Sequence, residues 1–264
     1  MNQALLWFLF RRHRLTLGLL LLVPILIGWV IGLLYPQLRE NQALFESLPF
    51  IKDFFKSEFV KRFSAAAIFT LPWQHPLCLI TFAVFPAVPI LGLPAGERGR
   101  GSLDLILATP LERKRLITVT ALFALLGSPL LLISCFLGTI AGATTSGDLH
   151  LLPLERYPLA GLNAIALSLF WAGAALVISV ASRDRPTATL VYSATIVVAF
   201  ALDSTARIAK GASWLSRWSP YGYFRPADTV GGSDSWWIHG VGLLIAGVLL
   251  LLLARELQQR RRSA

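Results

Sequence analysis

The amino-acid sequence predicts an all-α, polytopic integral membrane protein with six transmembrane helices. Of its 264 residues, 55% are hydrophobic and 14% are charged, and the mean hydropathy is +0.65. An ordinary soluble domain has roughly 25% charged residues. The apolar residues also form blocks of about 20, the length that an α-helix needs to cross a bilayer core about 30 Å thick. The sequence lacks the alternating apolar and polar segments of a membrane β-barrel.

Six apolar spans follow one another along the chain. Their expected limits are residues 15–35, 77–95, 116–142, 158–181, 187–206 and 236–254. The first span has 21 residues and no small-residue cleavage site after it, so we interpret it as a retained helix and not as a signal peptide. Because no internal repeat interrupts the pattern, we expect residues 1–264 to form a single transmembrane domain.

The fifth span ends beside two charged residues. Asp203 and Arg207 are spaced i, i+4, so they can pair on one face of a helix. An ion pair at the membrane interface is the first interpretation. The alternative is a polar site inside a transport path, because charged residues within a membrane are costly and usually functional.

The positive charges predict the orientation of the chain. With the N-terminus inside, the four inner segments hold 14 of the 24 Lys and Arg residues, and they are shorter than the outer segments. Inner loops of membrane proteins carry such an excess. We therefore expect a multi-pass protein of the cytoplasmic (inner) membrane with both termini in the cytoplasm. The net charge of +10 has the same explanation, so nucleic acid is not an expected partner.

The sequence contains none of the motifs expected of an enzyme or of an ATP-binding protein. A GxxxxGK[ST] phosphate loop, an HExxH pair and a zinc-type set of Cys and His are all absent. Cys78 and Cys135 lie within apolar spans, where cysteine acts as a small hydrophobic residue. We therefore predict no catalytic residue, no metal site and no cofactor in this chain.

The loop between the second and third spans carries an apolar stripe that water disfavours. Ser102 can cap a short helix, on which Leu103, Ile106 and Leu107 share one face. The sequence 109–112 then forms a capping box, with a proline at the first position of the next helix. The short helix either lies flat on the inner leaflet or docks onto a cytoplasmic partner.

This loop, residues 96–116, resembles the corresponding loop of ABC-type exporter permeases, the ABC-two family. The family pattern is a Glu, a Gly-Ser/Thr-Leu-Asp/Glu step, a Leu-Leu-x-Ser/Thr-Pro step and a basic cluster. The matching residues are Glu97, Gly101, Ser102, Leu103, Asp104, Ile106, Leu107, Thr109, Pro110 and Arg113. The lysine usual before the third span is replaced by Thr118 or a neighbour. The sequences at 182–186 and 219–224 resemble the family's later inner and outer loops.

The resemblance implies a permease subunit whose loop forms a cytoplasmic coupling helix between spans two and three. The implied partners are two cytoplasmic ABC ATPase subunits, which bind the ATP, and a second permease chain in a homodimer or heterodimer. ATP would then drive alternating access and export of a substrate across the membrane. Lipids, amphiphiles, peptides and drugs all suit the apolar spans. The alternative function is a polytopic membrane enzyme or a membrane assembly factor.

Overall fold

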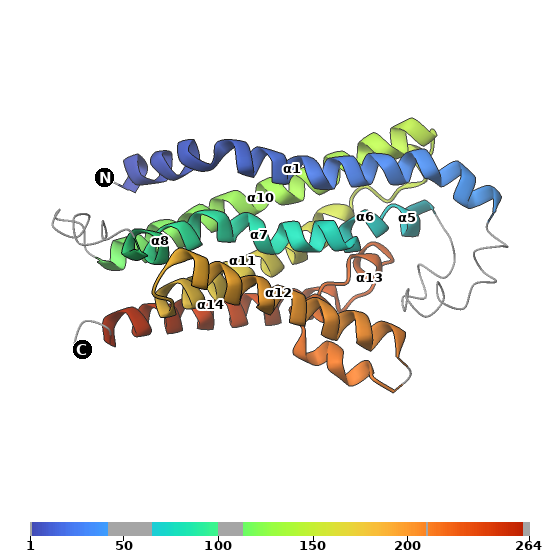
Figure 1. Ribbon diagram of the computed structural model, residues 1–264. Helices are drawn as coiled ribbons and strands as arrows, with labels where there is room; N and C mark the ends of the chain where they lie inside the picture. The colour runs from blue at the N-terminus through green and yellow to red at the C-terminus, as the bar shows by residue number, and fades with distance from the viewer. Residues whose placement is uncertain (1, 42–64, 100–112, 210, 261–264) are drawn as a thin grey trace.

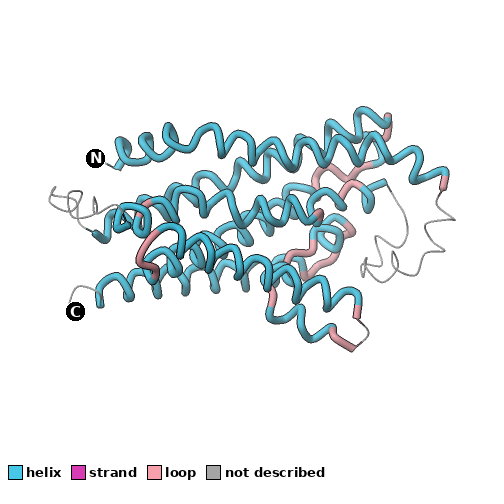
Figure 2. The backbone as a smooth tube through the Cα atoms, in the orientation of Figure 1, coloured by secondary structure: helices cyan, strands magenta, loops and turns pink. Residues whose placement is uncertain are grey.

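The computed structural model describes residues 2–41, 65–99, 113–209 and 211–260, and within these ranges it contains helices and no strand (Figures 1 and 2). The long helices are α1 (Asn2–Glu40), α7 (Pro76–Gly92), α10 (Arg113–Ser146), α11 (Tyr157–Ala181), α12 (Arg185–Ile208) and α14 (Trp236–Arg260). The short ones are α5 (Ala65–Ile68), α6 (Leu71–Gln74), α8 (Pro94–Gly99), η1 (Leu149–Leu151), η2 (Ser213–Trp218), η3 (Pro220–Tyr223) and α13 (Pro226–Val230). The predicted all-α membrane fold is confirmed.

Five single helices are long and apolar enough to cross a membrane: α1, α10, α11, α12 and α14. The bent pair of α5–α6 and α7 supplies a sixth span when it is counted as one. The span at 15–35 lies inside a longer helix, because α1 continues to Glu40 past Pro36. The predicted limits of the last three spans agree closely with α11, α12 and α14.

The second span differs from its predicted limits of 77–95. It begins further upstream, at Ala65, and bends by 46° between Gln74 and Pro76. His75 at the bend is extended (φ −61°, ψ 136°), because the residue before a proline avoids the helical region. At its other end α7 stops at Gly92, and Pro94 begins the separate helix α8. Pro76 thus marks the bend within the span, and Pro94 separates α7 from α8.

Helix α11 forms the centre of the bundle and contacts α7, α10, α12 and α14. In its most apolar window 67% of the residues are buried, against 22% in the windows of α1 and α14. The two outer helices expose rows of large aliphatic side chains, which suit contact with lipid acyl chains. Hydrogen bonds link the segment between α12 and α14 back to the bundle: Ser219 Oγ donates to Ala199 O (2.8 Å) and Tyr221 Oη donates to Leu79 O (3.4 Å).

Helices α1 and α10 pack against each other through glycines. Gly28 and Gly32 on α1 face Gly138 and Gly142 on α10, and each pair is spaced as in GxxxG. A Cβ atom on Gly28 would lie 2.7 Å from the carbonyl oxygen of Gly138, so no larger residue fits without moving the backbone. The missing side chains allow the two backbones to approach closely, which is how helices associate within lipid.

Candidate functional site

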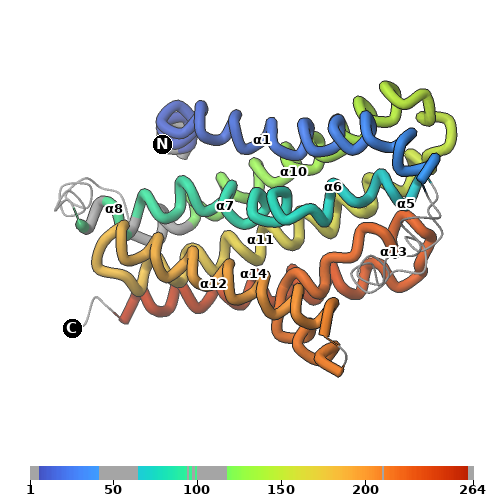
Figure 3. Tube along the Cα trace, turned by 45° about the vertical axis from the view of Figure 1, so that its right-hand side comes forward, coloured from blue at the N-terminus to red at the C-terminus, as the bar shows by residue number. Residues whose placement is uncertain are grey.

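One end of the bundle gathers all the segments that the charge pattern places in the cytoplasm. The N-terminal end of α1, helix α8, the start of α10, the turn between α11 and α12, and the C-terminal end of α14 lie together there (Figures 1 and 3). The described part of this end is rich in exposed arginines: Arg11, Arg12, Arg14, Arg183, Arg185, Arg255 and Arg260. The predicted loop leaves the bundle at Gly99 and returns at Arg113, so both of its attachments lie at this end.

The predicted coupling residues fall mainly outside the described ranges. Glu97 belongs to α8 and Arg113 is the first residue of α10. The remaining residues of the predicted motif lie between these helices, outside the described residues: Gly101, Ser102, Leu103, Asp104, Ile106, Leu107, Thr109 and Pro110. Their roles therefore stay predictions. The structure describes the two helices that flank them, α8 and α10.

Helix α8 is fastened to the centre of the bundle by a buried serine. Ser179 on α11 donates from Oγ to Ile90 O on α7 (3.2 Å) and accepts from the backbone N–H of Ala95 on α8 (3.2 Å). Ser179 is fully buried, so these two hydrogen bonds satisfy a polar group that would otherwise be costly inside the bundle. A single hydroxyl thus joins three helices at the start of the loop. Nothing in the sequence distinguished Ser179 from other serines in apolar spans.

The turn between α11 and α12 packs against the far end of α8. Asp184 caps α12 by accepting a hydrogen bond from the Thr187 backbone N–H (2.9 Å), and this bond lowers the pKa of the Asp184 carboxyl. A Cβ atom on Gly99 would lie 3.0 Å from Cβ of Asp184, so the glycine allows a close approach. The loop therefore begins in direct contact with the turn that starts α12.

His13 is a buried residue at the same end that the sequence did not single out. It lies on α1 with 9% of its surface exposed, and a Cβ atom on Gly92 would be 3.8 Å from its Nε2. His13 thus packs against the end of α7. Helix α1 therefore contacts the end of α7, directly before α8.

The Asp203 and Arg207 pair forms as the first interpretation predicts. Arg207 Nε lies 2.8 Å from Asp203 Oδ2, and Nη1 donates to Gln74 Oε1 of α6 (3.2 Å). Asp203 is only 3% exposed, and the ion pair with the Arg207 guanidinium offsets the cost of removing the carboxylate from water. The pair thus joins the end of α12 to the bend in the second span, away from the coupling loop.

The described residues offer no group of three or more His, Cys, Asp or Glu side chains that could hold a metal ion. At the arginine-rich end, the described residues present exposed basic side chains around helix α8, which is hydrogen-bonded to the bundle through Ser179.

Comparison with known sequences identifies the family. Residues 4–255 match the family described as the C-terminal domain of the multidrug efflux system permease Rv1217c. No curated protein matches the chain. The family match agrees with the resemblance to exporter permeases and supports transport over the alternatives of an enzyme or an assembly factor. The chain, with its multiple membrane-spanning helices, belongs to this family of multidrug efflux system permeases.

Proposed function

We propose that the chain is the membrane-spanning subunit of an ATP-driven ABC exporter in the cytoplasmic membrane, with both termini in the cytoplasm. A separate ATPase subunit, present in two copies, binds the coupling loop and drives alternating access. A second permease chain completes the pathway. The family match supports the transport role, and the observation that carries the coupling proposal is the attachment of α8 to three spans.

That attachment gives the loop a mechanical path into the bundle. A force applied to the loop reaches α8, which continues from α7, is bonded to α11 through Ser179 and touches the turn before α12. Rigid helices in contact move as bodies, so displacement of α8 displaces these spans together. An ATPase dimer that closes against two such loops would then rock the permease between inward-facing and outward-facing states.

Helix α12 has the exposed surface expected beside a pathway or a second permease chain. Its exposed residues include several that are polar: Thr187, Thr189, Ser193, Thr195 and Thr205. Leu190 and Val197 of α12 are exposed as well, whereas residues 241–253 of α14 expose large aliphatic side chains and no hydroxyl. Hydroxyl side chains on membrane helices usually face protein or water, so we place α12 against the pathway or the partner permease.

Orientation is tested by labelling single cysteines from outside intact cells with an impermeant thiol reagent. The variants are Asn2→Cys, Arg100→Cys, Asp148→Cys and Arg262→Cys. We expect only Asp148→Cys to react, because Asp148 follows α10 at the end opposite the termini. The native Cys78 and Cys135 are buried, which keeps the background low. Labelling of Arg100→Cys in intact cells would contradict the proposed orientation.

Reconstitution tests whether the ATPase binds ATP and the permease moves the substrate. Purified permease alone is expected neither to bind nor to hydrolyse ATP, since no phosphate loop is present in its sequence. In proteoliposomes, efflux of a fluorescent drug should require the permease, the ATPase and ATP together. Saturable ATP binding by the lone permease, or ATP-independent efflux at the full rate, would contradict the proposal.

A further inference from the structure

A polar recess lies at the end of the bundle opposite the termini, where α11, α13 and α14 meet. Its lining includes Asn163, Arg225, Asp228, Trp236 and His239, with hydroxyls from neighbouring residues. The recess has a volume of about 50 Å³, far below the roughly 300–1,000 Å³ of sites that enclose drug-sized molecules. It can therefore admit a small polar group and not a whole drug.

The walls of the recess are fixed by hydrogen bonds. Asn163 Nδ2 donates to the Trp236 carbonyl (3.1 Å) and to Thr229 Oγ1 (3.4 Å), which joins α11 to α13 and α14. Arg156 Nη1 donates to the Val230 carbonyl at the end of α13 (3.3 Å). These bonds use the amide of Asn163 within the wall itself.

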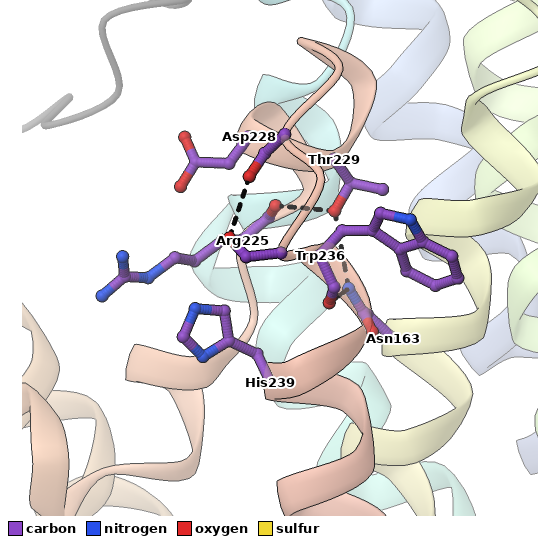
Figure 4. Close-up of a pocket in the computed structure, with 8 residues that line it drawn as sticks. Asn163, Arg225, Asp228, Thr229, Trp236 and His239 are labelled. Atoms are coloured by element: carbon purple, nitrogen blue, oxygen red, sulfur yellow. Dashed lines mark hydrogen bonds between the residues drawn. The ribbon is translucent and has the colours of Figure 1, made fainter.

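The charged side chains of the recess remain available. Arg225 donates from Nε to the Gly222 carbonyl (3.1 Å), which leaves its terminal nitrogens facing outward. Among the residues drawn in Figure 4, no hydrogen bond reaches the Asp228 carboxylate. In Figure 4 the Arg225 guanidinium, the Asp228 carboxylate and the His239 ring extend to the same side of the recess. A cation and an anion thus extend to the same side of the recess.

The tryptophans at this recess indicate that it lies at the level of the lipid headgroups. Trp236 lines it, and Trp237, the next residue of α14, is more than half exposed. Tryptophans gather where a membrane meets water, because their rings are apolar and their N–H groups are polar. A ligand that bears both charges and lies at this level is the headgroup of a zwitterionic phospholipid.

We propose that this recess binds the headgroup of a zwitterionic phospholipid in the outer leaflet. The phosphate lies against Arg225 and His239, and the ammonium lies against Asp228. A free phosphate ion carries the same anionic group but would meet the Asp228 carboxylate without an ammonium to balance it. The proposal concerns a lipid site outside the coupling end, so it does not depend on how ATP drives transport.

The test is native mass spectrometry of the purified full chain titrated with phosphatidylethanolamine and phosphatidylglycerol of identical acyl chains. We expect one phosphatidylethanolamine to bind about tenfold more tightly than phosphatidylglycerol, a difference of about 1.4 kcal/mol. Arg225→Gln should weaken both lipids about tenfold, because both carry the phosphate. Asp228→Asn should remove the preference between them, because only one lipid carries the ammonium.

Matched controls come from the same outer segment. Arg217→Gln and Asp234→Asn change an exposed arginine and an exposed aspartate that do not line the recess, and both should bind like the wild type. Thermal unfolding of each variant checks that the fold is kept, and if Arg225→Gln unfolds, the preference of Asp228→Asn still decides. An unchanged preference in Asp228→Asn, or binding of inorganic phosphate as tight as that of the lipid, would overturn the proposal.

Discussion

Leu107→Asp is expected to abolish co-purification of the ATPase with the permease while leaving the permease inserted in the membrane. Leu107 lies on the apolar stripe of the predicted coupling helix with Leu103 and Ile106. In a groove on the ATPase, the new carboxylate would be buried without a partner, at a cost of several kcal/mol. That cost lowers the association constant by several orders of magnitude.

Asp104→Asn provides the matched control on the same short helix. Asp104→Asn removes one negative charge, whereas Leu107→Asp adds one. Asp104 lies at the expected rim, where an exposed ion pair contributes only about 0–1 kcal/mol, so this variant should largely keep the ATPase. Both variants are expressed with the cognate ATPase, and the recovered ATPase is quantified at equal permease levels. Normal recovery with Leu107→Asp would instead place the apolar stripe on the inner leaflet.

Gly28→Leu is expected to disrupt the packing of α1 on α10 and to lower the stability of the whole bundle. The Cβ atom alone would lie 2.7 Å from Gly138 O and 2.8 Å from Gly138 Cα, and backbone atoms cannot move aside as a flexible side chain does. The helices must separate, which also strains the bond from Trp29 Nε1 to Thr145 Oγ1 (3.2 Å). The loss of stability should reach or exceed the roughly 1–3 kcal/mol usual for an overpacked core.

Gly18→Leu tests whether this effect belongs to the site or to the substitution. Gly18 lies on the same helix, and nothing lies within 4 Å of a Cβ atom placed there. We expect Gly18→Leu to unfold near the wild-type temperature, and Gly28→Leu to unfold well below it, when both are heated in the same detergent. Equal unfolding temperatures would show that α1 does not need its close contact with α10.

The spans were predictable because the length and apolar character of a membrane helix are fixed by the bilayer and not by the neighbouring helices. The bend in the second span was harder, because residues 65–74 are too short an apolar run to cross alone. They become part of a span only by joining α7 across Pro76. The ion pair of Asp203 and Arg207 was predictable because it is local to one turn of helix.

Contacts between helices could not be predicted from the sequence in the same way. Both GxxxG pairs are visible in the sequence, but nothing there says that α1 and α10 are the helices that meet. The bonds of Ser179 depend on three helices arriving at one point, and the polar recess depends on Asn163 reaching α13 and α14 from α11. The coupling residues themselves were identified from local pattern and resemblance, and they stay predictions.

Coupling to a separate ATPase through the loop at 100–112 is tested most directly by photo-crosslinking from position 107. A photoreactive amino acid replaces Leu107 in the full-length permease, cells are irradiated, and the crosslinked species is identified by mass spectrometry. We predict a crosslink to a soluble protein with a GxxxxGK[ST] phosphate loop, and none from the same amino acid at Val248, an exposed position on α14. Crosslinks from position 107 to phospholipid alone would contradict coupling through this loop.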